Sequence, residues 1–378
     1  MLKEILIAQY VEGMGTMKPK LSSTVSVVKN SESVLEFFKT NIRQSVRIKV
    51  NSDKIMRIVT SLDGERDVTQ IASDFDVDEK TLQNLLSFLQ NKGILDNVSP
   101  HEDFSDYGLY RRVIHFLSEY SSSHEQLLRM WNNIRNSNVL IVGLGAVGTW
   151  LSCNLIQSGL KNISLMDGDI VDISNLHRQF GFCEDDIGKL KVDVLAERLQ
   201  SYSSSITINK IPHYLTEESL HYFDNTHIDL IINCADKPNV DTTSLWIGEY
   251  AMKHGIPHII GGGYNMHISL IGQTVIPGKT SCIMCFQKTL EEENTIDTTK
   301  VKKLSVKNRK IGSFGPMCSL IASMTGMEAL KILSKEISPS NINRRGEFDI
   351  YSMSIKYQKY ERRDDCEWCG KNGKYYRS

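Results

Sequence analysis

Two pairs of cysteines are the clearest chemical signal in the sequence. Cys282 and Cys285 form one Cys-x-x-Cys turn, and Cys366 and Cys369 form a second turn near the end of the chain. Each turn presents two thiolates to one ion, so two turns complete the closed tetrahedral site typical of structural Zn²⁺. A redox role for one pair is the alternative. The other four cysteines are expected to be structural: Cys153, Cys183, Cys234 and Cys318.

A glycine-rich turn predicts a second site, one that binds phosphate. Gly143, Gly145 and Gly148 form a GxGxxG pattern directly after an apolar strand, and an apolar helix pattern follows. Glycines permit the tight turn and the close approach of the backbone, and the helix N-terminus faces the phosphate. Asp167 ends the next strand, where it can accept a hydrogen bond from a ribose hydroxyl. By this pattern alone, an NAD enzyme is the first hypothesis.

The charged residues that follow argue against a nicotinamide cofactor. Arg178 and Lys191 come soon after Asp167, where they can reach a triphosphate. Attack on an α-phosphate develops negative charge that cations stabilise, whereas a nicotinamide ring needs no such cluster. The alternative for Arg178 and Lys191 is a solvated surface. Asp169 and Asp172 are alternatively helix caps or surface acids.

Residues 105–370 resemble the ubiquitin-activating-enzyme-like family of ATP-dependent adenylating enzymes, which includes the ThiF, MoeB and HesA types. The GxGxxG turn, the run from Asp167 to Gln179 and the two cysteine pairs carry the resemblance. It implies an α/β fold, with a Rossmann-like doubly wound adenylation domain over residues 101–378. It also implies that these residues surround ATP: Gly143, Gly145, Gly148, Asp167, Asp169, Ser174, Asn175 and Lys191.

The same resemblance assigns the reaction chemistry. Arg178 and Lys191 would neutralise the phosphates, and Asp236, after the strand Leu230–Asn233, would hold Mg²⁺. Asp236 could instead cap the helix that begins near Pro238. In the family, an arginine from the N-terminal region reaches the phosphates of the partner subunit, which implies a homodimer. Arg111 is the candidate, and Arg112 is the alternative if the register slips by one.

Residues 1–100 are expected to form a separate small domain. They contain 13 basic and 13 acidic side chains, with short strands near Val25–Val28 and Val46–Val50 and three helices between residues 54 and 95. The arrangement looks like a winged helix of the PqqD-like type, which in peptide-modifying enzymes binds a leader peptide by adding a strand to its sheet. DNA binding and a purely structural role are the alternatives, and the balanced charge argues against DNA.

The segment after the first cysteine pair bears on mechanism. Family members that form a thioester carry a cysteine there or in an inserted domain, but residues 286–317 contain none, so no thiol relay is expected. Cys318 as a nucleophile is the alternative. The acids Glu291–Glu293 and Asp297 precede a basic run between residues 300 and 310. This run is either a solvated face or a crossover loop over the substrate and ATP.

Composition and organisation complete the prediction. A net charge of −1 provides no general attraction to nucleic acid or an anionic membrane, and the sequence contains no signal peptide or spanning run, so a cytoplasmic protein is expected. The small front domain, joined to an adenylating domain, is most similar to the enzymes of microcin C and pantocin biosynthesis. The predicted function is ATP-dependent adenylation of a carboxylate, from a C-terminal Asn or Asp or a Glu side chain, on a ribosomally made precursor peptide in antibiotic biosynthesis. The alternatives are adenylation of a sulfur-carrier protein ending in Gly-Gly, and a non-catalytic peptide-presenting partner of a cyclodehydratase.

Overall fold

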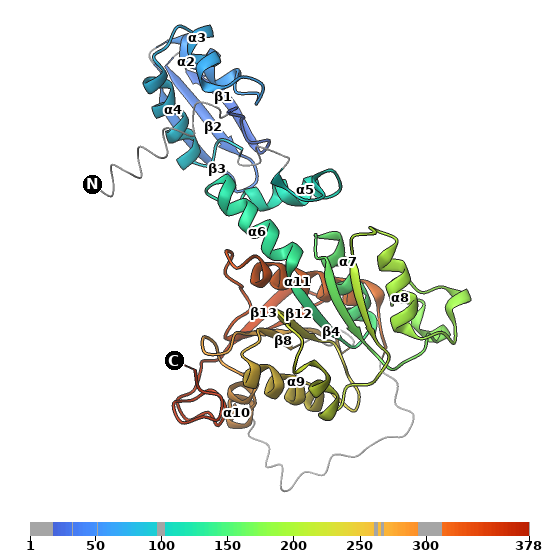
Figure 1. The fold of residues 1–378 in the computed structure, drawn as a ribbon. Coiled ribbons are helices and arrows are strands. Elements are labelled where there is room, and N and C mark those ends of the chain that lie inside the picture. Colours follow the sequence, from blue (N-terminus) through green and yellow to red (C-terminus); the bar gives the residue numbers. More distant parts are fainter. Residues whose placement is uncertain are drawn as a thin grey trace. The chain divides into compact units, whose positions relative to one another are not determined.

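The computed structural model describes residues 18–31, 33–50, 52–96, 103–260, 264–265, 268–293 and 312–377. The chain forms two compact units, Met1–Arg129 and Met130–Ser378, and each is described by itself (Figure 1). The proposed division of roles at residue 100 stays a prediction.

The first unit is built on a three-stranded antiparallel sheet in the order β1-β2-β3. Its strands are β1 (Val25–Ser31), β2 (Val34–Lys39) and β3 (Gln44–Lys49). Three helices follow the strands in the chain: α2 (Asp53–Thr60), α3 (Val68–Asp74) and α4 (Glu79–Asn91). The two strands and three helices expected from the sequence are confirmed. Sequence analysis missed β2, although its buried Leu35 and Phe37 alternate with Glu36 as a half-buried strand requires.

Every second side chain of β2 points to the face of the sheet that packs against the helices. Leu35 and Phe37 are buried in one core with Val59, Ile71 and Leu86 of the three helices. The helix α5 (Tyr107–Ser118) also belongs to the first unit, and α6 (His124–Asn136) runs across the boundary between the units. The PqqD-like winged-helix assignment stays a prediction.

The second unit contains a six-stranded sheet in the order β11-β8-β7-β4-β5-β6. The strands are β4 (Asn138–Val142), β5 (Asn162–Met166), β6 (Thr207–Ile211), β7 (Leu230–Asn233), β8 (His258–Ile260) and β11 (Gln273–Val275). All neighbours pair in parallel except β11 with β8. The chain runs outward from β4 through β5 to β6, then crosses to β7 on the other side. This reversal confirms the predicted doubly wound α/β fold and creates a switch point at the carboxyl ends of β4, β5 and β7.

Helices cover this sheet (Figure 1). They are α7 (Ala146–Gln157), α8 (Lys191–Gln200), α9 (Val240–His254) and α11 (Gly315–Ser334). The central strand β4 is buried from Val139 to Val142, as expected for a parallel strand with helices on both faces. Where α11 packs on α7, a Cβ on Gly326 would lie at ordinary contact distance from Leu151, so this glycine is a small interface residue rather than a strict requirement.

A second, four-stranded sheet has the order β13-β12-β10-β9. Its strands are β9 (Tyr264–Asn265), β10 (Ile268–Ile271), β12 (Arg344–Asp349) and β13 (Ser354–Lys359), and α10 (Ile283–Glu293) precedes α11. Asp297 and the basic run lie outside the described residues, so the crossover loop stays a prediction. No helix in the described part of the chain is long and apolar enough to span a membrane.

Two adjacent phenylalanines on β2 provide a test of the first unit's core. Phe37 is fully buried, whereas Phe38 points to the other face and is 39% exposed. We expect Phe37→Ala to destabilise the first unit by about 3–5 kcal/mol, because it leaves a cavity in the core. Phe38→Ala is the matched control and should cost under about 1 kcal/mol. Chemical denaturation followed by circular dichroism measures both. Equal losses would contradict the assigned sheet faces.

Candidate active site

The glycine-rich turn connects β4 to α7 and shows why two of its glycines are needed by the fold. Gly143 has φ of +92°, and a Cβ there would lie 2.6 Å from the backbone nitrogen of Ala235. A Cβ on Gly148 would lie 1.9 Å from the carbonyl oxygen of Gly143. Gly145 differs, because its φ is −77° and a Cβ there would meet nothing within 4 Å. The absence of a side chain at Gly145 therefore leaves space beside the helix N-terminus.

Asp167, at the end of β5, holds this turn in place. One of its carboxylate oxygens accepts a hydrogen bond of 2.6 Å from the backbone N–H of Leu144, and the other accepts one of 2.7 Å from Asp169. Asp167 is 9% exposed, so these charge-assisted bonds form in a largely water-excluded place. The carboxylate thus joins the glycine turn to the loop after β5. Its contact with a ribose stays a prediction.

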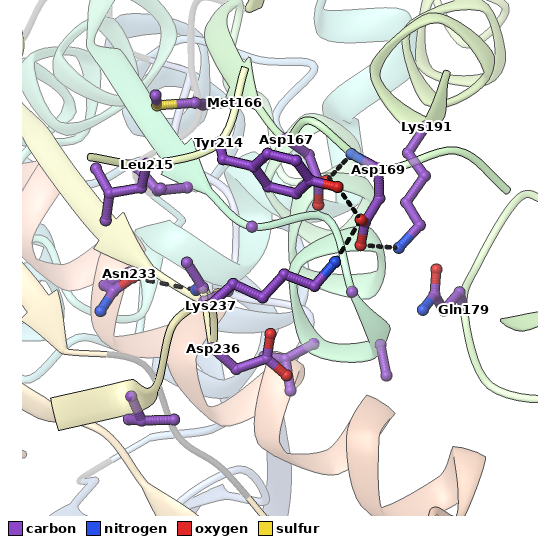
Figure 2. Close-up of a pocket in the computed structure, with 18 of the residues that line it drawn as sticks. Met166, Asp167, Asp169, Gln179, Lys191, Tyr214, Leu215, Asn233, Asp236 and Lys237 are labelled. Carbon is purple, nitrogen blue, oxygen red and sulfur yellow. Dashed lines mark hydrogen bonds and ion pairs between the residues drawn. The ribbon is translucent and has the colours of Figure 1, made fainter. Parts of the chain in front are cut away.

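A cavity of about 510 Å³ opens where the carboxyl ends of β4, β5 and β7 meet. Such an end of a parallel sheet is the usual ligand site of doubly wound folds. The structure brings most of the predicted residues together around it: Gly143, Gly145, Asp167, Asp169, Asn175, Arg178, Lys191 and Asp236. Gly148 and Ser174 do not line the cavity. Gln179, Tyr214 and Lys237 line it as well, although the sequence analysis had not assigned them to the site (Figure 2).

Asp169 gathers three of the cavity's polar side chains (Figure 2). One carboxylate oxygen accepts hydrogen bonds of 2.6 Å from Lys237 and 2.6 Å from the Tyr214 hydroxyl, and the other lies 3.2 Å from the Lys191 amine. Burial alone would raise the pKa of Asp169, but these partners outweigh it and lower the pKa to about 2. The carboxylate is therefore ionised at neutral pH. The Asp169 carboxylate forms ion pairs with two lysines. None of these contacts is a helix cap, so the alternative that Asp169 caps a helix has no support.

The loop after Asp169 is shaped by a capping box. Asp172 accepts a hydrogen bond from the backbone N–H of Ser174, and the Asn175 side chain accepts one from the backbone N–H of Asp172. The capping alternative for Asp172 is thereby confirmed. Ser174 is exposed, and its carbonyl oxygen accepts a hydrogen bond from Arg178. The side chain of Ser174 does not line the cavity, and its contact with ATP stays a prediction.

Two buried polar atoms on the cavity wall show that the site suits a polar ligand. Arg178 Nε and Gln179 Oε1 are inaccessible to water and have no hydrogen-bond partner among the described residues. Such atoms cost free energy unless a ligand or water satisfies them. Gln179 follows Arg178 directly, so its position beside the predicted cation was the signal that could have identified it.

Asp236 lines the cavity with an exposed carboxylate. Helix α9 is capped instead by Asn239, whose side chain accepts a hydrogen bond of 2.9 Å from the Thr242 N–H. The alternative that Asp236 caps this helix is therefore wrong, because the helix begins three residues later than that role requires. A carboxylate facing a polar cavity fits a Mg²⁺ ligand. The Mg²⁺ assignment stays a prediction.

The candidate arginines of the N-terminal region lie on α5 in the first unit. Arg111 and Arg112 are both exposed. Both the contact of Arg111 or Arg112 with phosphates and the homodimer stay predictions.

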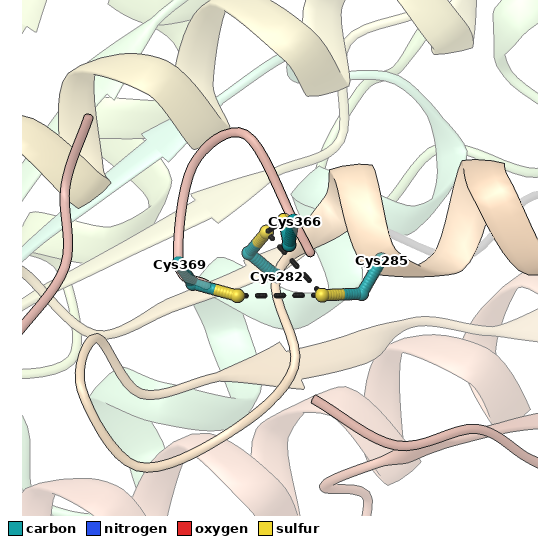
Figure 3. Close-up of side chains that lie close together, drawn as sticks. All are labelled: Cys282, Cys285, Cys366 and Cys369. Carbon is teal, nitrogen blue, oxygen red and sulfur yellow. Dashed lines mark hydrogen bonds between the residues drawn. The ribbon is translucent and has the colours of Figure 1, made fainter. Parts of the chain in front are cut away.

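The four paired cysteines come together in the second unit (Figure 3). All four are buried, with sulfur separations of 3.5 Å between Cys282 and Cys366 and 3.3 Å between Cys285 and Cys369. Zinc–sulfur bonds of about 2.3 Å in a tetrahedron place sulfurs about 3.8 Å apart. The predicted ligand set is thus brought together in a geometry compatible with structural zinc. A bound ion would join α10 to the C-terminal segment and leave no position for substrate.

The comparison with known families identifies the second unit. The ThiF family model matches residues 122–368, which is more than half of the chain. The chain belongs to the ThiF family. This family assignment and the adenylyltransferase relatives described next confirm the prediction of an ATP-dependent adenylyltransferase, while the substrate stays open.

Curated relatives match about 63% of the chain. The chain is 28% identical over 237 residues to the molybdopterin-synthase adenylyltransferase of Escherichia coli, covering 63% of this chain and 88% of that protein. It is 27% identical over 248 residues to the sulfur carrier protein ThiS adenylyltransferase of Bacillus subtilis, covering 63% of this chain and 66% of that protein.

Solved structures match nearly the whole chain. E. coli MccB superposes with a TM-score of 0.72 at 22% identity, covering 94% of this chain and 98% of MccB. PaaA superposes with a TM-score of 0.68 at 18% identity, covering 89% and 99%. These likenesses show the fold of both units.

The different surroundings of Gly145 and Gly148 predict that substituting one affects stability and substituting the other affects MgATP binding. Gly148→Ala should destabilise the second unit by about 2 kcal/mol or more, because its Cβ overlaps the Gly143 carbonyl. Gly145→Ala should keep the melting temperature within about 1 °C and weaken MgATP binding roughly tenfold, since its methyl group enters space at the cavity. Calorimetry of unfolding and of binding measures both effects. Normal MgATP affinity in a folded Gly145→Ala protein would contradict this assignment.

The cysteine cluster predicts one zinc ion per chain. Cys285→Ser should lose the metal and lower the melting temperature by roughly 5 °C or more, because the C-terminal segment is no longer joined to α10. Cys183→Ser is the matched control, since Cys183 lies on an exposed loop outside the cluster. Elemental analysis and thermal unfolding report the outcome. A fully stable protein that purifies without metal would contradict the zinc assignment.

Proposed function

We propose that this protein uses MgATP to adenylate a carboxylate of a ribosomally made precursor peptide. The observation that carries the proposal is the extent of the structural match. MccB covers 94% of the chain, including the first unit, whereas the sulfur-carrier adenylyltransferases cover 63%. MccB, a microcin C7 biosynthetic enzyme, has been solved with ATP and with MccA. A front unit shared with such an enzyme supports a peptide substrate.

The first unit offers a plausible place for a leader peptide. In its sheet, β2 lies between β1 and β3, so each outer strand has one side without a strand partner among the described residues. An extended peptide can pair there through main-chain hydrogen bonds, which require no particular charge pattern. The balanced charge of residues 1–100 fits this mode better than binding to nucleic acid.

The reaction needs charge neutralisation more than acid–base chemistry. A peptide carboxylate is already ionised at neutral pH, so it attacks the α-phosphorus of ATP without a general base. A bond forms between the carboxylate oxygen and phosphorus, and the bond to the bridging oxygen breaks to release pyrophosphate. Arg178 and Lys191, with Arg111 of the partner subunit, would stabilise the developing negative charge, and Asp236 would hold Mg²⁺. Mg²⁺ supplies further neutralisation of the phosphates.

The described cysteines favour an adenylate that is consumed without a thiol intermediate. Cys234 lines the cavity, but burial raises the pKa of its thiol to about 12, so the reactive thiolate is scarce at neutral pH. Cys318 is buried in α11, where its thiol donates to the Phe314 carbonyl. Cys318 is therefore not placed as an accessible nucleophile, and the Cys234 thiol, although it lines the cavity, is protonated at neutral pH. We propose as substrate a peptide whose C-terminal Asn or Asp, or Glu side chain, is activated in antibiotic biosynthesis, in line with the structural match to MccB.

Peptide-dependent exchange of labelled pyrophosphate into ATP tests this function. Candidate precursor peptides should support exchange, and the same peptides with every carboxylate amidated should not. Lys191→Ala should reduce exchange by about 10²–10³-fold, whereas Lys189→Ala, at an exposed position two residues earlier, should leave it nearly unchanged.

The alternatives give different exchange patterns. Exchange only with a small carrier protein ending in Gly-Gly would replace the peptide function with sulfur-carrier activation. Tight peptide binding without exchange would indicate a non-catalytic presenting partner.

A further inference from the structure

We propose that Lys237 is a phosphate-binding residue of the cavity and donates hydrogen bonds to the polyphosphate of ATP. This inference rests on the proposed function, because it assumes that ATP occupies the cavity. Among the described residues that line the cavity, three are lysines or arginines, namely Arg178, Lys191 and Lys237. The motifs of the sequence assign the first two. Lys237 immediately follows the predicted Mg²⁺ ligand Asp236 and has no assigned role.

The side chain of Lys237 is held across the cavity (Figure 2). Its amine lies 2.6 Å from Asp169 Oδ1 and 4.9 Å from the centre of the Tyr214 ring. The Tyr214 hydroxyl donates to the same oxygen of Asp169, which fixes the ring beside the amine. An unrestrained lysine loses rotamer freedom when it is fixed by a ligand. Here part of that loss has already occurred, so the amine is preorganised.

Lys237 also retains the capacity to bind a ligand. An ammonium group has three N–H donors, and one of these is directed at Asp169. The Lys237 side chain is 58% exposed, whereas the Lys191 side chain is 5% exposed. Lys191 therefore reaches Asp169 from the buried wall, and Lys237 reaches it from the open side of the cavity. A phosphate entering from solvent can meet the remaining donors of Lys237.

The charge of the cluster favours an anion. Asp169 carries one negative charge and contacts two lysines through its two oxygens, so the three side chains together carry a net charge of +1. The Tyr214 hydroxyl stays neutral, because its hydrogen bond to Asp169 raises the pKa of Tyr214. Asp169 thus fixes two cations in one place without cancelling both. Asp167, Asp236 and Arg178 also line the cavity, so the preference comes from the local pairing of the two lysines, which can donate charge-assisted hydrogen bonds to the charged oxygens of a polyphosphate that an uncharged nucleoside lacks.

Binding of MgATP and of adenosine to matched lysine variants tests the inference. Lys237→Met should weaken MgATP binding by about tenfold to a hundredfold and change adenosine affinity by less than about twofold, because only MgATP carries the phosphates. Lys210→Met is the matched control. Lys210 forms an equally short 2.6 Å pair with Asp193 at 50% exposure, away from the cavity, so its variant should bind both ligands normally. Lys237→Arg should restore most of the MgATP affinity.

The outcomes separate this inference from the proposed function. Normal MgATP affinity of folded Lys237→Met, or an equal loss of adenosine affinity, would overturn the role of Lys237 while peptide-dependent exchange by the wild type still stood. A selective loss of MgATP affinity in a protein that shows no exchange with any peptide would support Lys237 and contradict the proposed function. Thermal unfolding of each variant establishes that the protein is folded.

Discussion

The carboxylate of Asp167 is the interaction on which the site depends. It bonds the backbone N–H of Leu144 within the glycine turn and the N–H of Asp169 after β5, so one side chain fixes two cavity walls relative to each other. Asp169 is then placed where its own carboxylate meets Lys191, from α8, and Lys237, from the loop after β7. A buried carboxylate whose two oxygens both accept hydrogen bonds from N–H groups holds the two backbone segments in fixed positions. Loss of either bond would leave one carboxylate oxygen without a partner in a buried site.

Strong local patterns made much of this predictable. The buried strand β4, the glycine turn and Asp167 are close in sequence to one another or to a helix start, so spacing alone predicted a nucleotide site there, although by itself it suggested NAD. The paired cysteines were equally clear, because two Cys-x-x-Cys turns together supply the four thiolates of a closed zinc site. The missed strand β2 is as long as β3, but the adjacent Phe37 and Phe38 interrupt its alternation of apolar and polar residues.

The rest of the site depends on tertiary contacts that no local pattern reports. Tyr214 and Lys237 follow β6 and β7, and they meet at Asp169 only because the sheet places these strand ends at one edge. Ser174 shows the converse, since a residue within a matching motif can face solvent when a capping box sets the loop. Sequence motifs therefore predicted which segments form the cavity, and the fold decided which side chains enter it.

The central claim is that a peptide carboxylate attacks the α-phosphorus of ATP, and oxygen labelling tests it most directly. A candidate precursor peptide with ¹⁸O in its carboxylates is incubated with the protein and MgATP, and the nucleotide products are analysed by mass spectrometry. The account predicts AMP that carries ¹⁸O, because the carboxylate oxygen bonded to phosphorus leaves with AMP when the acyl group is transferred. Pyrophosphate should be unlabelled. Formation of ADP with labelled inorganic phosphate would contradict the account, because it would place the attack at the γ-phosphate.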